Sequence, residues 1–315
     1  MGAFLGIDTS NYTTSAAIFI SGEGVVLQKK KLLPVNKGEK GLRQSDAVFH
    51  HTAALSQLVE ELFGGYDGSL SAVGVSYAPR DAEGSYMPCF LAGLNAAGCI
   101  AAAGRLPLYR FSHQAGHIAA ALFSAGRLDL VDECFIAFHV SGGTTEVLFV
   151  KPDAEKIFKT EIIGAALDLN AGQVIDRVGV TLGLDFPCGA QLDMLAQKSK
   201  RSFSIKPKIT GGNCNLSGLE NKCKAMLSNG ESPEDISRYC IEYISATLEK
   251  MAEFTLETYG NLPLVFSGGV MSNSIIRQRF SEKYGAFFAE PAFSSDNAAG
   301  IAVLANLCHH RRISE

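Results

Sequence analysis

The chain has 315 residues, of which 47% are hydrophobic and 19% charged, so it can bury a large core and is not a disordered protein. Its formal net charge of -4 excludes the uniformly basic surface of a general nucleic-acid binder, so any RNA contact needs a local basic patch. The first residues form no basic stretch, so we expect no leader, and no apolar run reaches the ~18 residues of a membrane span. Eight cysteines without a C-x-x-C pair are typical of reduced core residues. We therefore expect a cytoplasmic protein that does not enter the membrane.

Residues 4–20 have the pattern of a hairpin with a polar turn at residues 8–14. Residues 134–150 repeat this plan around a second polar turn at 141–145. The repetition predicts a duplicated fold. Ser, Thr and Gly turns of this kind present backbone N–H groups and hydroxyls to phosphate, so the first turn is a possible phosphate site formed by Asp8, Thr9 and Ser10.

Helices and short buried strands alternate along the rest of the chain. Helical periodicity covers 45–63, 88–103, 113–125, 233–258 and 272–283, and buried strands are expected at 72–77 and 262–267. The clearest helix, 233–258, has Ser232 as an N-cap, Pro233 in its first turn and Gly260 behind its end. The alternation predicts an α/β protein with helix-covered sheets. No low-complexity linker separates the halves, so we expect a ligand cleft between two domains.

His113 and His117 are four residues apart at the start of a predicted helix, so their imidazoles share one face and could bind one ion. The alternative is that they are two polar residues near a helix end. Asp296 precedes a helix of small residues and suits either an N-cap or a carboxylate ligand for the same ion, and the two roles are compatible. No carboxylate stands between the histidines, which disfavours a metallopeptidase.

Two glycine pairs each follow a buried strand, at Gly142 and Gly143 and again at Gly268 and Gly269. Glycine lets a backbone approach phosphate closely, although tight turns alone also explain many such pairs. Carboxylates can accept ribose hydroxyls and an amide can reach a base or phosphate. Further candidates for the nucleotide site are Asp176, Gly189, Asp193 and Asn273.

One dense basic strip lies in the second half of the chain, and residues 29–31 form a second run. A solvated loop is the usual explanation of such a strip. If the protein contacts tRNA, these are the first surfaces to consider, because phosphate contacts supply most nonspecific affinity. The strip contains Lys198, Lys200, Arg201, Lys206 and Lys208, with Phe203 among them.

Together these motifs resemble the family that forms threonylcarbamoyladenosine in tRNA, the TsaD group of the actin-like ATPase (ASKHA) superfamily. The resemblance spans nearly the whole chain. It implies duplicated ribonuclease H-like domains with a ligand cleft between them, an N-terminal subdomain of residues 1–108 plus 292–315 and a C-terminal subdomain of residues 109–291. The motifs that carry it lie at residues 6–10, 113–117, 140–144, 170–177, 184–189, 216–219, 268–273 and 295–299.

The resemblance implies that His113, His117 and Asp296 bind one divalent metal, iron or zinc. It also implies transfer of a threonylcarbamoyl group from threonylcarbamoyl-AMP to the N6 amine of the adenosine 3′ of the tRNA anticodon. ATP is the other nucleotide that such a site would take. The implied partners are tRNA, an inert paralogue and a P-loop ATPase of the same pathway. The implied adenylate-binding residues are Val140, Ser141, Gly142, Gly143, Thr144, Asp176, Gly189, Asp193 and Asn273.

Several positions depart from the family pattern around the expected ligand. An acidic pair is replaced near Tyr12, a glutamate by Ala115, a histidine by Thr144 and a lysine by Glu220, and Cys188 alters a Pro-Gly-Gly-Pro run. The departures suggest a divergent paralogue. Two alternatives are therefore a protein that carbamoylates a small-molecule acceptor and a noncatalytic nucleotide-binding partner of a true family member. A sugar kinase is a more distant option, because no residue stands out as its catalytic base.

Overall fold

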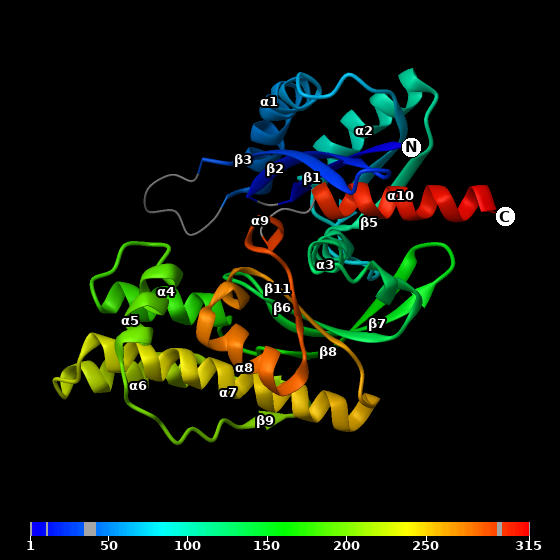
Figure 1. Ribbon diagram of the computed structural model, residues 1–315. Helices are drawn as coiled ribbons and strands as arrows, with labels where there is room; N and C mark the ends of the chain where they lie inside the picture. The colour runs from blue at the N-terminus through cyan, green and yellow to red at the C-terminus, as the bar shows by residue number, and fades with distance from the viewer. Residues whose placement is uncertain (1, 11, 35–41, 295–297, 315) are drawn as a thin grey trace. The chain divides into compact units, whose positions relative to one another are not determined.

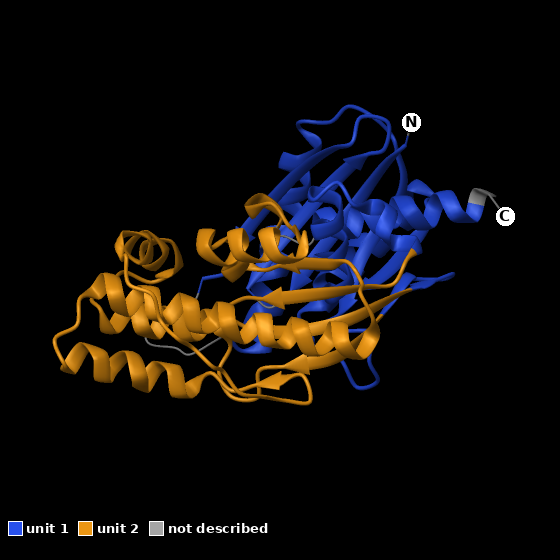
Figure 2. Cartoon of the chain, turned by 60° about the horizontal axis from the view of Figure 1, so that its bottom comes forward, with its two compact units in different colours: residues 1–132, 152–159, 295–315 blue, residues 133–151, 160–294 orange. Residues whose placement is uncertain are grey.

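The computed structural model of the chain describes residues 2–10, 12–34, 42–294 and 298–314. The chain forms two compact units, one of residues 1–132, 152–159 and 295–315 and one of residues 133–151 and 160–294 (Figure 2). Each unit contains a five-stranded sheet with helices packed on it (Figure 1). The α/β class expected from the sequence is confirmed.

The first unit is built on a sheet with the strand order β3-β2-β1-β4-β5. Strands β1, β2 and β3 pair antiparallel, whereas β1, β4 and β5 pair in parallel. Its elements are β1 (Ala3–Ser10), β2 (Thr13–Ile20), β3 (Val25–Leu32), α1 (Gln44–Phe63), β4 (Leu70–Ala78), α2 (Phe90–Gly104), β5 (Leu108–Ser112), α3 (His113–Ser124), the 3-10 helix η1 (Leu128–Asp132) and α10 (Ala298–Ser314).

The second unit repeats this topology, since its sheet has the order β12-β11-β6-β7-β8. Again a hairpin, β6 and β7, lies next to two parallel strands, β11 and β12. The predicted duplication is confirmed by this match. The elements are β6 (Phe135–Val140), β7 (Thr145–Asp153), β8 (Ile157–Ala165), α4 (Ala171–Thr181), α5 (Gly189–Lys198), β9 (Ile209–Thr210), β10 (Asn213–Cys214), α6 (Ser217–Ser228), α7 (Pro233–Tyr259), β11 (Leu264–Ser267), η2 (Gly269–Ser272), α8 (Ser274–Tyr284), β12 (Phe287–Phe288) and α9 (Pro291–Ser294).

Residues of β1 point alternately to the two faces of the first sheet, and this alternation decides what each side chain can do. On one face, Leu5 and Ile7 are fully buried in a cluster with α1 and α2. Burial of each contributes about 1.5–3 kcal/mol. On the other face, Phe4 packs against the His309 ring of α10, with ring centroids 5.5 Å apart. Figure 1 shows α1 and α2 on one side of this sheet and α10 with α3 on the other. Asp8 follows Phe4 by an even number of residues and therefore faces α3 and α10.

Glycines let α10 approach its neighbours in the first unit very closely. A methyl group at Gly6 of β1 would lie 2.1 Å from the carbonyl oxygen of Ala298, and one at Gly300 would lie 1.9 Å from the carbonyl oxygen of Gly116 in α3. Both distances are far shorter than a van der Waals contact between the atoms. The position of α3 against α10 therefore depends on the absence of a side chain at Gly300.

The second unit is organised around α7, the helix with the clearest signals in the sequence. The Ser232 hydroxyl accepts a hydrogen bond from the Asp235 backbone N–H, and Pro233 lies in the first turn. The predicted helix at 272–283 instead begins at Ser274, because Asn273 caps it and residues 269–272 form a 3-10 turn. None of the helices in the described part of the chain has the length and hydropathy needed to cross a bilayer.

Residues 109–132 lie in the first compact unit, whereas the subdomain predicted for residues 109–291 would place them in the second. Strand β5 extends the first sheet, with Tyr109 paired to Gly74 of β4. Helix α3 packs along α10, which is almost two hundred residues away in the chain. A hydrophobic pattern does not reveal such a distant partner, and this explains the difference.

Candidate functional site

His113 and His117 lie one turn apart at the start of α3, as their spacing predicts. The helix begins at His113 because the Ser112 hydroxyl accepts a hydrogen bond from the Ala115 N–H at 3.2 Å. The two imidazole rings meet edge to face, with centroids 4.8 Å apart. Two nitrogens that share one ion, each about 2.1 Å from it, lie within about 4.2 Å of each other. The ring separation is compatible with that requirement.

Asp8, near the end of β1, is hydrogen-bonded to His113 of α3. Nδ1 of His113 lies 3.2 and 3.1 Å from the two carboxylate oxygens of Asp8, whose side chain is 2% exposed. Burial by itself raises the pKa of Asp8, but the charge and hydrogen bond of His113, together with hydrogen bonds from Ser76 and Ser10, outweigh burial, so the net pKa is lowered. An ionised carboxylate only accepts hydrogen bonds, so Nδ1 carries the proton and Nε2 of a neutral His113 is left as the ligand atom.

A histidine that donates one ring N–H to a carboxylate is the usual arrangement of a metal-binding imidazole. The two imidazoles of His113 and His117, the first of them oriented by Asp8, therefore fit a divalent ion on the chemistry of their residues. Within residues 2–10, 12–34, 42–294 and 298–314, no three His, Cys, Asp or Glu side chains converge as a complete metal-binding group. The third expected ligand, Asp296, lies outside the described residues.

The expected phosphate turn of Asp8, Thr9 and Ser10 lies in strand β1, because pairing with β2 continues as far as Ser10. The Thr9 side chain is fully buried, and its hydrogen bonds stabilise the fold. Its hydroxyl donates to the carbonyl oxygen of Cys89 at 3.0 Å and accepts from the N–H of Gly93 at 3.1 Å. Thr9 thus fastens β1 to the start of α2. The polar turn that the sequence places at residues 8–14 is shorter in the structure.

His51 of α1 is a buried histidine, unlike the half-buried His113 and His117, and no pattern in the sequence singles it out. Its side chain is fully buried, and Nδ1 lies 2.8 Å from the hydroxyl of Thr14. Burial lowers the pKa of His51 to about 4, although the negative charge of Asp8 opposes that shift. The ring is therefore neutral at pH 7. Asp8 and His51 come from different elements, so no local pattern could have linked them.

In the second unit, residues 141–144 form a tight turn between β6 and β7. The Ser141 hydroxyl accepts hydrogen bonds from the N–H groups of Gly143 and Thr144 at 3.3 and 3.1 Å. Val140, just before the turn, is fully buried and anchors it in the core. A methyl group at Gly142 or Gly143 would meet no atom within 4 Å, so packing does not require glycine there. Space over both residues is consistent with the close approach of a ligand.

The other glycine pair behaves differently at its two positions. Gly268 has φ +95°, and a methyl group there would lie 2.2 Å from the carbonyl oxygen of Val140, so backbone packing explains this glycine. Gly269 has open space around it. The structure thus brings the two predicted glycine turns together within the second unit.

Two further candidates, Asn273 and Asp193, have hydrogen-bonding roles in the second unit. The Asn273 side chain accepts from the backbone N–H groups of Ile275 and Ile276, both at 3.1 Å. Asp193 accepts from both the N–H and the hydroxyl of Ser274, at 3.1 and 3.0 Å. These contacts bring α5 and the start of α8 together.

Asp176 lies on α4 and holds the following loop. It accepts from the backbone N–H of Cys188 at 2.9 Å, and Gly189, the next residue, begins α5 with open space around it. Asp176 and Gly189 are therefore close together, as two residues that bind the same nucleotide must be.

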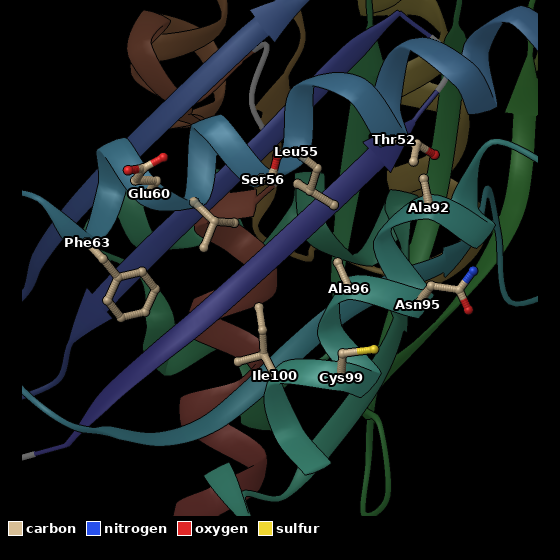
Figure 3. A pocket seen from close by; sticks show the side chains of 11 residues that line it. Thr52, Leu55, Ser56, Glu60, Phe63, Ala92, Asn95, Ala96, Cys99 and Ile100 are labelled. Atoms are coloured by element: carbon tan, nitrogen blue, oxygen red, sulfur yellow. The ribbon is translucent and has the colours of Figure 1, made fainter. Parts of the chain in front are cut away.

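A cavity of about 600 Å³ lies between α1 and α2 of the first unit (Figure 3). Its walls are mostly apolar, with Leu55 and Phe63 on α1 facing Ala96 and Ile100 on α2. None of the residues proposed here for metal or nucleotide lines it. Its chemistry does not suit a charged nucleotide.

The duplicated topology defines the class of the protein, which is that of the actin-like ATPase fold. The chain resembles component A of (R)-2-hydroxyglutaryl-CoA dehydratase from Acidaminococcus fermentans, with a TM-score of 0.57 and 18% identity over 98% of this chain and 100% of that chain. It also resembles HypF from T. kodakarensis, with a TM-score of 0.62 and 13% identity over 99% of this chain and 48% of that chain. At these identities the likeness shows the fold alone.

The sequence comparison is more specific. The model of the TsaD family, tRNA N6-adenosine threonylcarbamoyltransferase, matches residues 34–303. The tRNA N6-adenosine threonylcarbamoyltransferase of Bacillus licheniformis is 31% identical, over 98% of this chain and 92% of its own length. The chain therefore belongs to the TsaD family of transferases.

Proposed function

We propose that this protein transfers a threonylcarbamoyl group from threonylcarbamoyl-AMP to the N6 amine of the adenosine 3′ of the tRNA anticodon, in a metal-dependent reaction. In this transfer the amine nitrogen bonds to the carbamoyl carbon, the bond from that carbon to the phosphate oxygen breaks, and AMP leaves while the amine loses a proton. The observation that carries the proposal is the histidine pair of α3, with His113 held by the buried carboxylate of Asp8.

His113, His117 and Asp296 would hold the metal, which we expect to be iron or zinc. When bound, such an ion supplies Lewis acidity that polarises an oxygen of the acyl donor. Asp8 keeps the proton of His113 on Nδ1 and fixes the orientation of the ring. We assign no residue as general base, because no side chain in the described part of the chain is tied to that role.

The adenylate part of the donor would bind in the second unit. Gly142 and Gly143, which packing does not require to be glycine, leave room for phosphate oxygens over their backbone. Asp176 has one carboxylate oxygen hydrogen-bonded to Cys188, so its other oxygen is available to a ribose hydroxyl. Binding of this kind would position the donor and release AMP afterwards. The full proposed set is Val140, Ser141, Gly142, Gly143, Thr144, Asp176, Gly189, Asp193, Gly268, Gly269 and Asn273.

Contacts with tRNA would come from local basic surfaces. The segment between α5 and β9 has no regular secondary structure, and Arg201 within it pairs with Glu231 and lies 4.9 Å over the Phe203 ring. Its exposed lysines are better placed for phosphates, and residues 29–31 lie on the edge strand β3. These lysines are Lys200, Lys206 and Lys208, and Lys198, which is also exposed, lies just before the segment at the end of α5.

A small-molecule acceptor is the second candidate, and the observation that favours it is Glu220. This carboxylate stands where the family pattern has a lysine, and it pairs with Lys224 at 2.6 Å and with Arg177 at 3.1 Å. The change from lysine to glutamate is thus accompanied by ion pairs between Glu220 and two basic neighbours. Consumption of donor that requires a metabolite and ignores tRNA would favour this candidate. Nucleotide binding without any turnover of donor would instead favour a noncatalytic partner.

The direct test incubates the purified protein with threonylcarbamoyl-AMP and unmodified tRNA, alone and with an inert paralogue and a P-loop ATPase of the pathway. Mass spectrometry of the digested tRNA measures the modified nucleoside. His113→Ala and His117→Ala should abolish its formation, whereas His50→Ala, which changes a histidine of α1, serves as the matched control. Absence of product with every partner set would contradict the proposal.

A further inference from the structure

The segment between α5 and β9 in the second unit concentrates positive charge. Five of the eleven residues from Lys198 to Lys208 are lysine or arginine and none is acidic, although the whole chain has a net charge of -4. The segment has no regular secondary structure and leads from the end of α5 to β9 (Figure 1). Because charged loops are usually only solvated, the directions of these side chains decide whether they form a site.

The exposure of the side chains alternates along this segment. Every second residue from 203 to 209 is half-buried, whereas all the even-numbered residues from 200 to 210 are exposed. Alternation with a period of two is typical of an extended backbone that has one face against the protein. The outward side chains therefore form one row, with neighbours about 6.6 Å apart. The row consists of Lys200, Ser202, Ser204, Lys206, Lys208 and Thr210.

The inward face of the segment is fastened to α7 and to the core of the unit. At its start, the Ser199 hydroxyl donates to the Asp235 carboxylate at 2.5 Å. Four residues later, the Phe203 ring packs edge to face on Tyr239, with ring centroids 5.1 Å apart. At its end, Ile209 packs against the hydrophobic core. Contacts on the inward face thus fix the direction of the outward row.

The outward row offers hydrogen-bond donors and no negative charge. Within the described part of the chain, Lys200, Lys206 and Lys208 take part in no ion pair, and the hydroxyls between them make no side-chain hydrogen bond. Arg201 is different, because it lies outside the row and pairs with Glu231. Ammonium and hydroxyl groups in a line are suited to a series of phosphate oxygens, since each group can donate to one of them.

The other basic run, residues 29–31 on β3, lacks this arrangement. Its three lysines are consecutive in a strand, so neighbouring side chains point to opposite faces of the sheet. At most two of these lysines therefore share a face. The row in the second unit instead presents donors on one side along an extended chain of ten residue steps, a length of about 33 Å. Of the two runs, this row is the one that can follow a polymer.

We propose that the row of residues 200–210 binds the sugar–phosphate backbone of RNA without reading its base sequence. The inference rests on the proposed function, for which it names the surface that holds the tRNA. An anionic membrane would also attract lysines, but the row contains no apolar side chain that could enter a bilayer. Each phosphate of a single strand that a lysine neutralises adds about 0.7 to the slope of log affinity against log salt concentration.

The test measures binding of unmodified tRNA and of an oligouridylate to the full chain by fluorescence anisotropy, at salt concentrations of about 50 to 200 mM. The double variant Lys206→Gln and Lys208→Gln removes two charges from the row, whereas Lys206→Arg and Lys208→Arg keeps them. The matched control is Lys29→Gln and Lys31→Gln, which removes the same charge from exposed residues of β3. Vesicles with phosphatidylserine test the membrane, and thermal unfolding verifies that each variant is folded.

We expect the glutamine pair in the row to weaken binding of both RNAs about tenfold or more at the lowest salt concentration and to reduce the salt slope by about 1.4. The arginine pair and the β3 control should stay within about threefold of the unchanged chain. Equal losses in the row and the β3 control, an unchanged salt slope, or a loss seen only with vesicles would overturn the inference. These measurements need no donor, so a failure of the transfer reaction alone would count only against the proposed function.

Discussion

Gly300 offers a sharp test of how the fold places the two histidines. In Gly300→Ala the new methyl group would lie 1.9 Å from the carbonyl oxygen of Gly116 and 2.8 Å from the backbone nitrogen of Ala120. Both atoms belong to the backbone of α3, so neither can rotate away. To restore a contact of about 3.2 Å, α10 and α3 must separate by roughly 1.3 Å.

The magnitude follows from two opposing effects. Alanine has a helix propensity about 1 kcal/mol better than that of glycine. Separation by more than an ångström forfeits half or more of the dispersion energy along the interface of the two helices, and overpacking typically costs about 1–3 kcal/mol or more. We therefore expect Gly300→Ala to lower the free energy of unfolding by about 2–4 kcal/mol. At about 2–4 °C per kcal/mol, the melting temperature should fall by roughly 4–16 °C.

Gly98→Ala is the matched control, because Gly98 is also helical and a methyl group there meets no atom within 4 Å. This control should stabilise the protein by about 0.4–1 kcal/mol. Calorimetry and urea titration of both variants measure the difference, and zinc titration reports on the histidines of α3. Equal stability of Gly300→Ala and Gly98→Ala would refute the packing argument.

Three other predictions address the site. Asp8→Asn should weaken zinc binding about 10- to 100-fold in a chelator competition, because the carboxylate no longer orients His113. An unchanged zinc affinity would show that Asp8 does not support metal binding by His113. Because burial lowers the pKa of His51 to about 4, the unfolded state binds more protons between pH 6.5 and 4, so stability should fall by about 3 kcal/mol as pH drops through that window. Urea titrations measure this slope, and its persistence in His51→Gln would contradict the assignment. Gly268→Ala, at φ +95° and 2.2 Å from a backbone carbonyl, should cost about 3 kcal/mol or more in thermal unfolding, whereas Gly269→Ala should cost less than about 1; similar values would count against this account of the turn.

The elements with strong local signals were predictable from the sequence. Helix α7 has a Ser cap and a Pro start, and α3 begins at His113 as its small apolar residues indicate. The duplication was visible because both hairpins carry the same order of apolar strand and polar turn. The start of α8 was misplaced because Asn273, expected to bind a nucleotide, caps that helix. A side-chain cap overrides hydrophobic periodicity at a helix end.

Within the candidate site, the sequence predicted the histidine pair but not its support. Asp8 was expected in a phosphate turn, yet its carboxylate hydrogen-bonds His113, which is 105 residues away. The close contact of Gly300 with Gly116 likewise depends on backbone geometry that no spacing reveals. Local patterns indicate which residue types are present, whereas the pairing of β1 with β4 and the packing of α10 determine which of them meet.

The most direct test of the metal centre is a crystal structure of the protein grown with zinc, with anomalous diffraction data collected at the zinc absorption edge. The account predicts one strong anomalous peak bonded to Nε2 of His113, to a ring nitrogen of His117 and to a carboxylate oxygen of Asp296. A peak elsewhere, with the two imidazoles turned away from each other and no ion between them, would contradict it.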